Sequence, residues 1–300
     1  MNAKKSTLLA FILNASFALL EFVFGALFNS SAVLADAVHD AGDAVAIGLS
    51  ALLERVSNRK EDDRFTLGYK RFSLLGAMIT AVILITGSLF VLMENIPKLL
   101  HPEPVNQQGM LVLGIAAIAI NLLASLVVRG GQTKNEAILS LHFLEDILGW
   151  LAVIVVAIVL NFTDWYFLDP LLSLAISAFI LSKALPRFWE NLKIFLAAVP
   201  EGIDMEDLEQ DLAAMDNVTS LNQLNIWSMD GLENNAIVHI CIADWQRYDQ
   251  TKHAIRHLLE DHGIQNITIE VDVDRQCHQG HQRDIQKIQQ SSQHHHHQHH

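Results

Sequence analysis

The sequence predicts an α-helical polytopic membrane protein with six transmembrane helices, followed by a small cytoplasmic α+β domain. Three observations carry this prediction. Six apolar runs, each close to the length that crosses a bilayer, fill the first part of the chain. The composition is 51% hydrophobic, with a mean hydropathy of +0.28, which is high for a soluble protein. After about Pro200 the long apolar runs stop, and short periodic segments follow.

The apolar runs supply the six predicted spans in chain order. They cover about 7–28, 33–53, 74–93, 109–128, 138–160 and 168–185. The first run is too long for a signal-peptide core and lacks an evident cleavage site, so it is predicted to be a span. The turn at 29–31 is short, which makes the first two spans antiparallel neighbours. Asp169-Pro170 opens the last run and predicts a helix cap followed by proline at the first helical position.

Basic residues orient the spans. The loop 54–72 holds six Lys and Arg residues, which marks it as cytoplasmic. Arg129 and Lys134 fall on the same side, and Lys4 and Lys5 agree, whereas the opposite loops contain only Lys98. The prediction is a multi-pass protein of the inner (plasma) membrane with both termini in the cytoplasm.

Three regions are predicted: a transmembrane domain at 1–188, a cytoplasmic domain at 189–274, and a histidine-rich polar tail at 275–300. The cytoplasmic domain has the periodicity of a helix, two strands, a helix and a strand, at 203–216, 221–228, 235–243, 250–262 and 266–273. That order is αββαβ, a ferredoxin-like or metallochaperone-like α+β fold. The tail resembles either a loose metal-binding tract or an expression tag, and it is left out of the fold prediction.

The net charge of −13 belongs to the cytoplasmic domain. Residues 201–274 hold sixteen Asp and Glu but three Lys and Arg, while the rest of the chain is balanced at seventeen of each. This balance argues against a nucleic-acid partner, because phosphate binding needs a basic surface. The two cysteines, Cys241 and Cys277, imply no disulfide framework.

Two matched motifs predict a metal site inside the membrane. His39 and Asp43 lie four residues apart in the second run, and His142 and Asp146 repeat that spacing in the fifth. On a helix this spacing places both side chains on one face. Two such faces supply two imidazoles and two carboxylates, a tetrahedral set that suits Zn²⁺. Interhelical hydrogen bonds are the alternative for a single motif, but a matched pair in separate spans favours metal.

Other polar residues are weaker candidates. Glu21, in the first run, is either a structural carboxylate, a neutral acid or part of the transport path. Asp36, Asp40 and Glu145 flank the predicted ligands and rank below them, with polar bundle contacts as the alternative. In the cytoplasmic domain His239, Glu270 and Asp272 could project from comparable strand faces and bind metal, or they could lie on a solvated sheet face.

These features together resemble the cation diffusion facilitator family, and most closely its bacterial zinc/cadmium exporters of the ZitB and CzcD type. The resemblance rests on the two H-x-x-x-D motifs, on Leu34–Asp43, on Phe65-Thr-Leu-Gly-Tyr-Lys-Arg71 and on Ile226-Trp-Ser, and it covers about residues 7–274. It implies a homodimer of proton-coupled antiporters, with His39, Asp43, His142 and Asp146 as the transport ligands. It also implies Zn²⁺ and Cd²⁺ as substrates, since manganese-type members usually carry Asp or Asn at the first histidine.

The chain departs from the family pattern at two places. Phe65 and Tyr69 stand near the Gly68 segment, where the family often has histidines, so the loop metal site is expected to be absent. The cytoplasmic motifs H-x-H-x-W and H-x-T-x-Q correspond here to Gln223–Trp227 and Asn266–Glu270. These replacements put in doubt a binuclear regulatory site, and with it metal-driven tightening of the dimer.

The predicted function is proton-coupled export of a divalent transition metal, most of all Zn²⁺ and also Cd²⁺, by alternating access. No G-x-x-x-x-G-K-[ST] motif is present, which disfavours an ATP-driven pump. The alternatives are a membrane-embedded metal sensor without flux and an intramembrane metallohydrolase. The hydrolase would need an open metal position beside a general base, and the four-ligand set predicts no enzyme.

Overall fold

The computed structural model of the protein describes residues 3–128 and 134–273, in two compact units, Met1–Glu190 and Asn191–His300. Arg129 and the predicted tail at 275–300 lie outside the described residues. So do the side chains of helical residues 3–10, 13, 50, 51, 54, 123–128 and 134–144, and His142 is among them.

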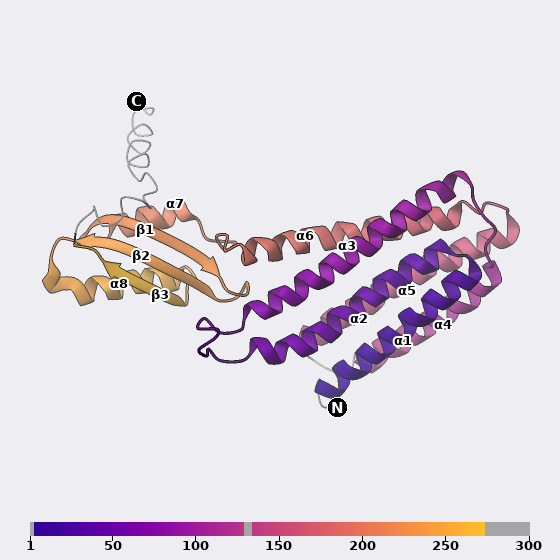
Figure 1. Cartoon of the computed structure of the whole chain (residues 1–300), viewed down its shortest axis with the longest axis horizontal. Helices are drawn as coiled ribbons and strands as arrows, with labels where there is room; N and C mark the ends of the chain where they lie inside the picture. Colours follow the sequence, from indigo (N-terminus) through magenta and orange to yellow (C-terminus); the bar gives the residue numbers. More distant parts are fainter. Residues whose placement is uncertain (1–2, 129–133, 274–300) are drawn as a thin grey trace, which may run out of the picture. The chain divides into compact units, whose positions relative to one another are not determined.

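Six helices form the first unit, one for each predicted apolar run (Figure 1). They are α1 (Ala3–Phe28), α2 (Ser31–Ser57), α3 (Arg71–Leu100), α4 (Gln107–Val128), α5 (Lys134–Phe162) and α6 (Leu168–Phe195). The helix α6 continues about ten residues past the apolar run that predicts it. Hydropathy marks only the apolar part of the helix, and the more polar residues after Leu185 are helical as well.

Three described stretches are long and apolar enough to cross a membrane: Arg71–Leu100, Glu145–Phe162 and Leu168–Phe195. The described apolar parts of α1 and α4, Asn14–Phe28 and Gln107–Leu122, are shorter. The helix α2 carries three aspartates within its apolar run. The described part of the first unit therefore contains six long helices, while six membrane spans stay a prediction.

The six-helix unit buries several acids and exposes many large apolar side chains, and it also has an apolar core that includes Met110 and Trp150. Large apolar side chains such as Leu27, Phe90 and Met93 are 66–75% exposed on its surface. Glu21, Asp36, Asp40 and Asp146 are at most 6% exposed. Soluble proteins do not distribute their side chains in this way, but a helical bundle with lipid as its solvent does.

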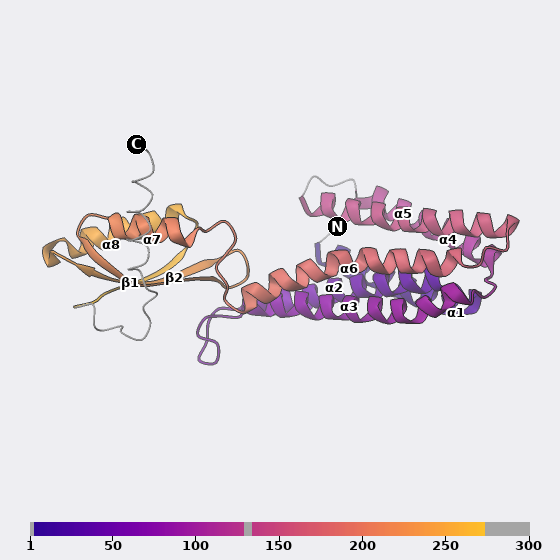
Figure 2. The same ribbon diagram turned by 90° about the horizontal axis from the view of Figure 1, so that it is seen from above.

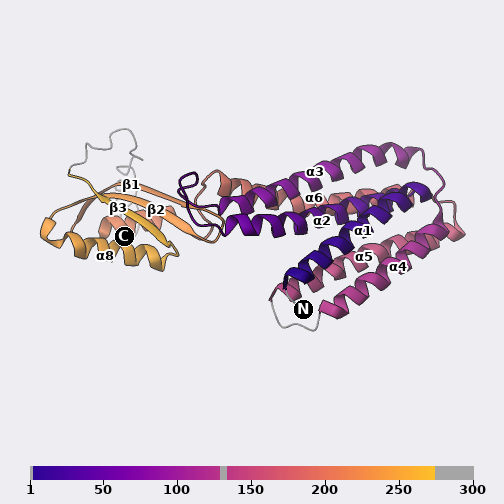
Figure 3. The same ribbon diagram turned by 60° about the horizontal axis from the view of Figure 1, so that its bottom comes forward.

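The helix α2 lies at the centre of the contacts in this unit. It packs against α1 and α3 and also contacts α5, while α4 packs along α5 (Figure 3). The turn from α1 into α2 places Asn29 in the left-handed region at φ 52°, which asparagine tolerates better than most residues. Gly42 of α2 faces Leu84 of α3, and a Cβ there would clash with that side chain. Close helix contacts of this kind are typical of membrane bundles.

Asp169 does not cap its own helix, contrary to the prediction. The helix α6 begins one residue earlier, at Leu168, and the Asp169 carboxylate turns to the start of α2. It accepts hydrogen bonds from Ser30 Oγ at 2.6 Å, from Ser31 N at 2.6 Å and from Ala32 N at 3.3 Å. A buried carboxylate at a helix N-terminus satisfies unpaired N–H groups and complements the helix dipole. Asp169 therefore fixes the start of α2 from a different helix.

The second unit is a three-stranded sheet with two helices on one face (Figure 2). Its elements are α7 (Met205–Ala214), β1 (Val218–Ser228), β2 (Asn234–Ile242), the 3₁₀ turn η1 (Trp245–Arg247), α8 (Tyr248–Asp261) and β3 (Asn266–Val271). The strand order is β1-β2-β3, with β1 and β2 antiparallel and β2 and β3 parallel. The predicted αββαβ order is present, and the assignment to a ferredoxin-like fold stays a prediction.

Local signals in the sequence explain these boundaries. Asp204 caps α7 by accepting from the backbone N–H groups of Glu206 and Asp207. Gly231, at φ 89°, completes the turn from β1 to β2, and Gly263, at φ 78°, follows the end of α8, as glycine commonly does at a helix C-terminus. Leucines and isoleucines from α7, α8 and β2 then form the core between the helices and the sheet, among them Leu208, Leu212, Ile240, Ile255 and Leu259.

We expect Asp169→Ala to lower the apparent midpoint of thermal unfolding of the purified protein, measured by tryptophan fluorescence. The substitution leaves a buried hydroxyl and two buried backbone N–H groups at the start of α2 without their acceptor, a loss of about 2 kcal/mol. Asp164→Ala is the matched control, because that exposed carboxylate accepts only a surface hydrogen bond from Tyr166 in the described structure. Equal midpoints for the two variants would contradict the capping role.

Candidate metal centre

One face of α2 carries four polar side chains in an otherwise apolar helix. Asp36, His39, Asp40 and Asp43 follow the spacing i, i+3, i+4, i+7, which aligns them along two turns of the same side. Alanine and valine fill the positions between them and favour close packing with neighbouring helices. The spacing of these four residues therefore gives α2 one polar face, which is expected to point into the bundle.

The predicted ligands from α2 and α5 come together in space. The His39 Nε2 atom lies 3.7 Å from Asp43 Oδ2 on its own helix and 3.9 Å from Asp146 Oδ1 on α5. Asp146 is 6% exposed, and the side chains of His39 and Asp43 are about one-fifth exposed. His142 lies on α5 one turn before Asp146, but its side chain is outside the described residues.

These distances suit a small divalent cation. In a tetrahedral zinc site each ligand atom lies about 2.0–2.2 Å from the ion, which separates the ligand atoms by roughly 3.4 Å. Both observed separations are larger than this, and in the described structure the ligand atoms of His39, Asp43 and Asp146 do not all lie within 4.8 Å of one another. A bound divalent cation would have to draw these side chains closer together. Asp146 comes from a different helix than His39 and Asp43, and relative movement of α2 and α5 would therefore open or close the site.

Further acids surround this trio. Asp36 is buried against α5, where its Oδ1 atom lies 3.6 Å from the position that a Cβ on Gly149 would take. Asp40 is buried towards α1 and lies near Glu21. Glu145 differs from both, because its carboxylate is 42% exposed and pairs with Lys183 of α6 at 2.5 Å. The structure therefore brings Asp36 and Asp40 near the candidate centre and places Glu145 in a surface ion pair.

A second cluster lies in the sheet domain. His239 on β2 and Glu270 on β3 are register partners, with His239 Nδ1 3.7 Å from Glu270 Oε2. The same nitrogen lies 3.4 Å from Asp272 Oδ1, just after β3. One ligand atom from each of the three residues falls within 4.8 Å of the others. The three residues therefore lie together on the face of the sheet opposite the helices, as the sequence analysis considered possible.

Asn222 supports this cluster and was missed from the sequence. Its side-chain amide donates to Asp272 Oδ2 at 2.6 Å, and its carbonyl oxygen accepts from Ser220 Oγ at 2.9 Å. The residue is 3% exposed, so its hydrogen bonds fix the Asp272 carboxylate in a buried position. The sequence carries no clear signal for this role, because Thr219 and Gln223 flank the pair and the strand register shifts at both places.

The loop between α2 and α3 is ordered by an aspartate and by aromatic rings. Asp62 accepts from Tyr69 Oη at 2.6 Å and from the backbone N–H groups of Arg64 and Phe65 at 2.9 Å. The Tyr69 hydrogen bond lowers the pKa of Asp62 and raises the pKa of Tyr69. The rings of Phe65, Tyr69 and Phe72 lie 4.6–5.6 Å apart. Phe65 and Tyr69, which stand where the family often has histidines, therefore contribute contacts that stabilise the loop.

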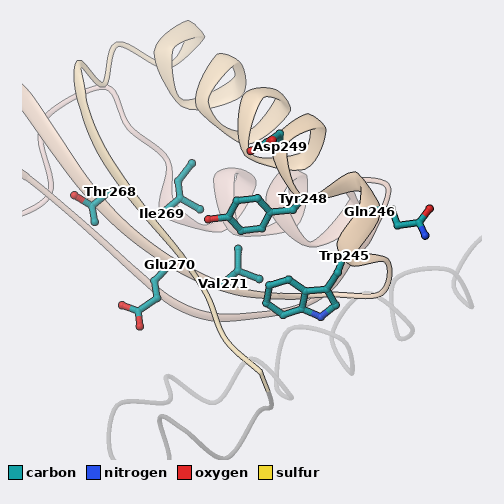
Figure 4. Close-up of a pocket in the computed structure, with 8 residues that line it drawn as sticks. All are labelled: Trp245, Gln246, Tyr248, Asp249, Thr268, Ile269, Glu270 and Val271. Atoms are coloured by element: carbon teal, nitrogen blue, oxygen red, sulfur yellow. The ribbon is translucent and has the colours of Figure 1, made fainter.

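Figure 4 shows a shallow groove beside β3 in the same domain. The aromatic rings of Trp245 and Tyr248 line it together with Ile269 and Val271 of β3. Glu270 also borders it, but in Figure 4 its carboxylate points away from the aromatic pair. Aromatic and aliphatic residues make up half of the lining, and Gln246, Asp249, Thr268 and Glu270 make up the other half. Among the described residues, Glu270 alone belongs to both the groove and the candidate metal cluster.

Comparison with known proteins agrees with this architecture. The profile of the cation efflux transmembrane domain matches residues 7–196, which is more than half of the chain. The chain therefore belongs to the cation efflux family, the cation diffusion facilitators, and it is a membrane protein. The family resemblance predicted from the paired motifs is confirmed.

Named relatives span nearly the whole chain. A zinc transporter ZitB of Pectobacterium atrosepticum is 31% identical over 282 residues, 92% of this chain and 88% of that protein. A cadmium, cobalt and zinc/H(+)-K(+) antiporter of Bacillus subtilis is 29% identical over 282 residues, 92% and 91% of the two chains. The metal cation efflux system protein CzcD of Cupriavidus metallidurans is 28% identical over 243 residues, 79% and 76% of the two chains.

We expect the sheet-domain cluster to bind one Zn²⁺ ion per chain, because it offers an imidazole and two carboxylates that Asn222 helps to orient. The measurement is calorimetric zinc titration of a chain ending at Asp274, with Asp43→Ala added to weaken the membrane site. Adding Asp272→Ala should remove the remaining binding. Adding Asp261→Ala instead, which changes an exposed carboxylate on α8, should leave it intact. Binding that survives Asp272→Ala would contradict the assignment.

Proposed function

We propose that this protein is a proton-coupled antiporter that exports Zn²⁺, and also Cd²⁺, from the cytoplasm. The ion crosses by alternating access through one intramembrane site made of His39, Asp43, His142 and Asp146. The observation that carries the proposal is the convergence of His39, Asp43 and Asp146 inside a bundle whose outer surface is apolar. The names of the relatives, which include zinc transporters and a metal/proton antiporter, support metal efflux.

The chemistry of the ligands explains the coupling to protons. Histidine binds metal when it is neutral and carboxylates bind when they are ionised, so metal binding releases protons. A cytosolic ion enters the site when it is open inwards. When the site opens outwards, protons from the more acidic side compete for the same nitrogen and oxygen atoms. Imidazole, with an ordinary pKa of about 6.5, is suited to this competition.

The same proposal includes orientation and assembly. The six basic residues of the loop 54–72 support a cytoplasmic position for that loop, and with six spans for both termini, in a protein of the plasma membrane. The acidic sheet domain then faces the cytosolic pool of cations. Two protomers form a homodimer, as the family resemblance implies, and each protomer holds its own transport site.

A sensor that binds metal without moving it is the alternative class of function. It would use the same ligands, so binding experiments alone do not separate the two proposals. Flux does, because only a transporter accumulates metal inside a sealed vesicle. A metallohydrolase would need a metal position left open for water, whereas two imidazoles and two carboxylates complete a tetrahedral set.

We expect inside-out proteoliposomes with an acidic lumen to accumulate Zn²⁺, and Asp43→Asn or Asp146→Asn to reduce this uptake at least 100-fold. Each substitution removes a charged ligand from the ion. Uptake is followed with a lumenal zinc dye. Asp63→Asn, in the exposed loop after α2, is the matched control and should transport normally. Tight zinc binding by the wild type without uptake would move the protein to the sensor class.

We also expect His39→Asp to raise the ratio of Mn²⁺ to Zn²⁺ transport about tenfold. Carboxylate oxygens suit Mn²⁺, whereas imidazole nitrogen favours Zn²⁺, so the substitution changes the ligand set in a predictable direction. The same vesicles measure it, with each metal supplied separately. An unchanged ratio in a folded, active variant would show that His39 does not contact the transported ion.

A further inference from the structure

Glu21 of α1 is a buried carboxyl group that the metal cage does not use. It is 0% exposed, and neither of its carboxylate oxygens receives a hydrogen bond from a donor among the described residues. No Lys, Arg or His in the described part of the chain forms an ion pair with it. Buried carboxyl groups are normally supplied with donors, so this one requires an explanation.

The groups around Glu21 are themselves acids. Asp40 of α2 lies within hydrogen-bonding range of it, and Asp36 of α2 and Asp146 of α5 lie within electrostatic range. The helix α4, which also contacts α1, has no charged residue in its sequence. Among the described residues, the charged groups that interact with Glu21 are therefore acids, which are negative when ionised.

Two carboxyl groups can share a hydrogen bond only when one of them carries a proton. Several carboxylates close together in a medium of low polarity cannot all be ionised, because each raises the energy of the others. A proton, the smallest cation, would satisfy Glu21 without requiring a larger cavity. No three ligand atoms of Glu21 and its neighbours are close enough to form a candidate metal group in the described structure.

We propose that Glu21 is a proton-binding site of the antiporter, separate from the metal ligands, and that its proton leaves when metal binds. The inference rests on the proposed antiport function. Glu21 lies on α1, which supplies none of the four ligands, so the proton and the metal need not compete for the same atom.

The coupling is electrostatic and therefore reciprocal. A divalent cation held by His39, Asp43 and Asp146 makes the surroundings of Glu21 more positive, which favours loss of its proton to water. The proton on Glu21 weakens metal binding by the same factor. When the metal leaves on the outer side, the uncompensated carboxylates draw a proton back to Glu21. One proton thus moves against the metal in addition to any that bind to the ligands.

Glu21→Gln tests this site in the full-length protein, because glutamine has the shape of a protonated glutamic acid but cannot ionise. The first readout is the number of protons released per Zn²⁺ bound, measured with a pH dye in weak buffer. We expect Glu21→Gln to release about one proton fewer than the wild type. Glu21→Asp, which keeps an ionisable group, should release the wild-type number.

The second readout is transport in proteoliposomes. Glu21→Gln should lose Zn²⁺ uptake driven by a pH gradient but keep exchange of labelled for unlabelled Zn²⁺ at equal pH, a process that needs no net proton movement. Unchanged proton release together with gradient-driven uptake in Glu21→Gln would overturn the proposal. Loss of both exchange and uptake in a folded variant would overturn it too, since Glu21 would then be a structural residue.

A wild-type measurement keeps the proposal testable if Glu21→Gln does not fold. Infrared difference spectra recorded on adding Zn²⁺ should show loss of a protonated carboxyl band, and that band should shift in Glu21→Asp. Absence of such a band would overturn the proposal. A wild type that shows no gradient-driven uptake at all would instead refute the proposed antiport function, so the two failures are distinguishable.

Discussion

The desolvation of carboxylates is the constraint on which the rest of this structure depends. A charged group inside a lipid-solvated bundle costs several kcal/mol unless a cation, a proton or a set of donors compensates it. Asp169 is compensated by the start of α2, through Ser30, Ser31 and Ala32. The acids near the middle of α2 have no such helix terminus. A proton, a cation or donors from other side chains can offset their burial instead.

The framework around α2 follows from this requirement. A ligand stripe can act on an ion only if the helix that carries it keeps a defined position, and three features hold α2. The Asp169 carboxylate fixes its first turn, Gly42 lets α3 approach closely, and a short turn through Asn29 keeps α1 beside it. The contact with α5 is smaller, and it is also where the ligands meet. A bundle held firmly on one side of its metal site and loosely on the other suits a site that opens by relative helix movement.

Much of this architecture could be predicted from local sequence signals. Long apolar runs and the H-x-x-x-D spacing depend on one helix at a time, so they predicted six helices and the convergence of His39, Asp43 and Asp146. The Gly263 helix end and the αββαβ order are local in the same sense. Partners from distant segments could not be predicted. Asp169 looked like a cap for its own helix, because no sequence pattern links it to residue 31. The bond from Asn222 to Asp272 likewise joins strands fifty residues apart.

The separation of ligands from other acids bears on how one bundle could move two kinds of cation. If every proton bound only to a ligand atom, the same groups would set the affinity for metal and the affinity for protons. A substitution that changed one affinity would then also change the other. An acid on α1 would let the two affinities vary separately, because its interaction with the metal depends on distance and local polarity rather than on coordination. The affinity for zinc could then be set by His39 and its neighbours. The strength of proton coupling would be set by how closely α1 lies against α2.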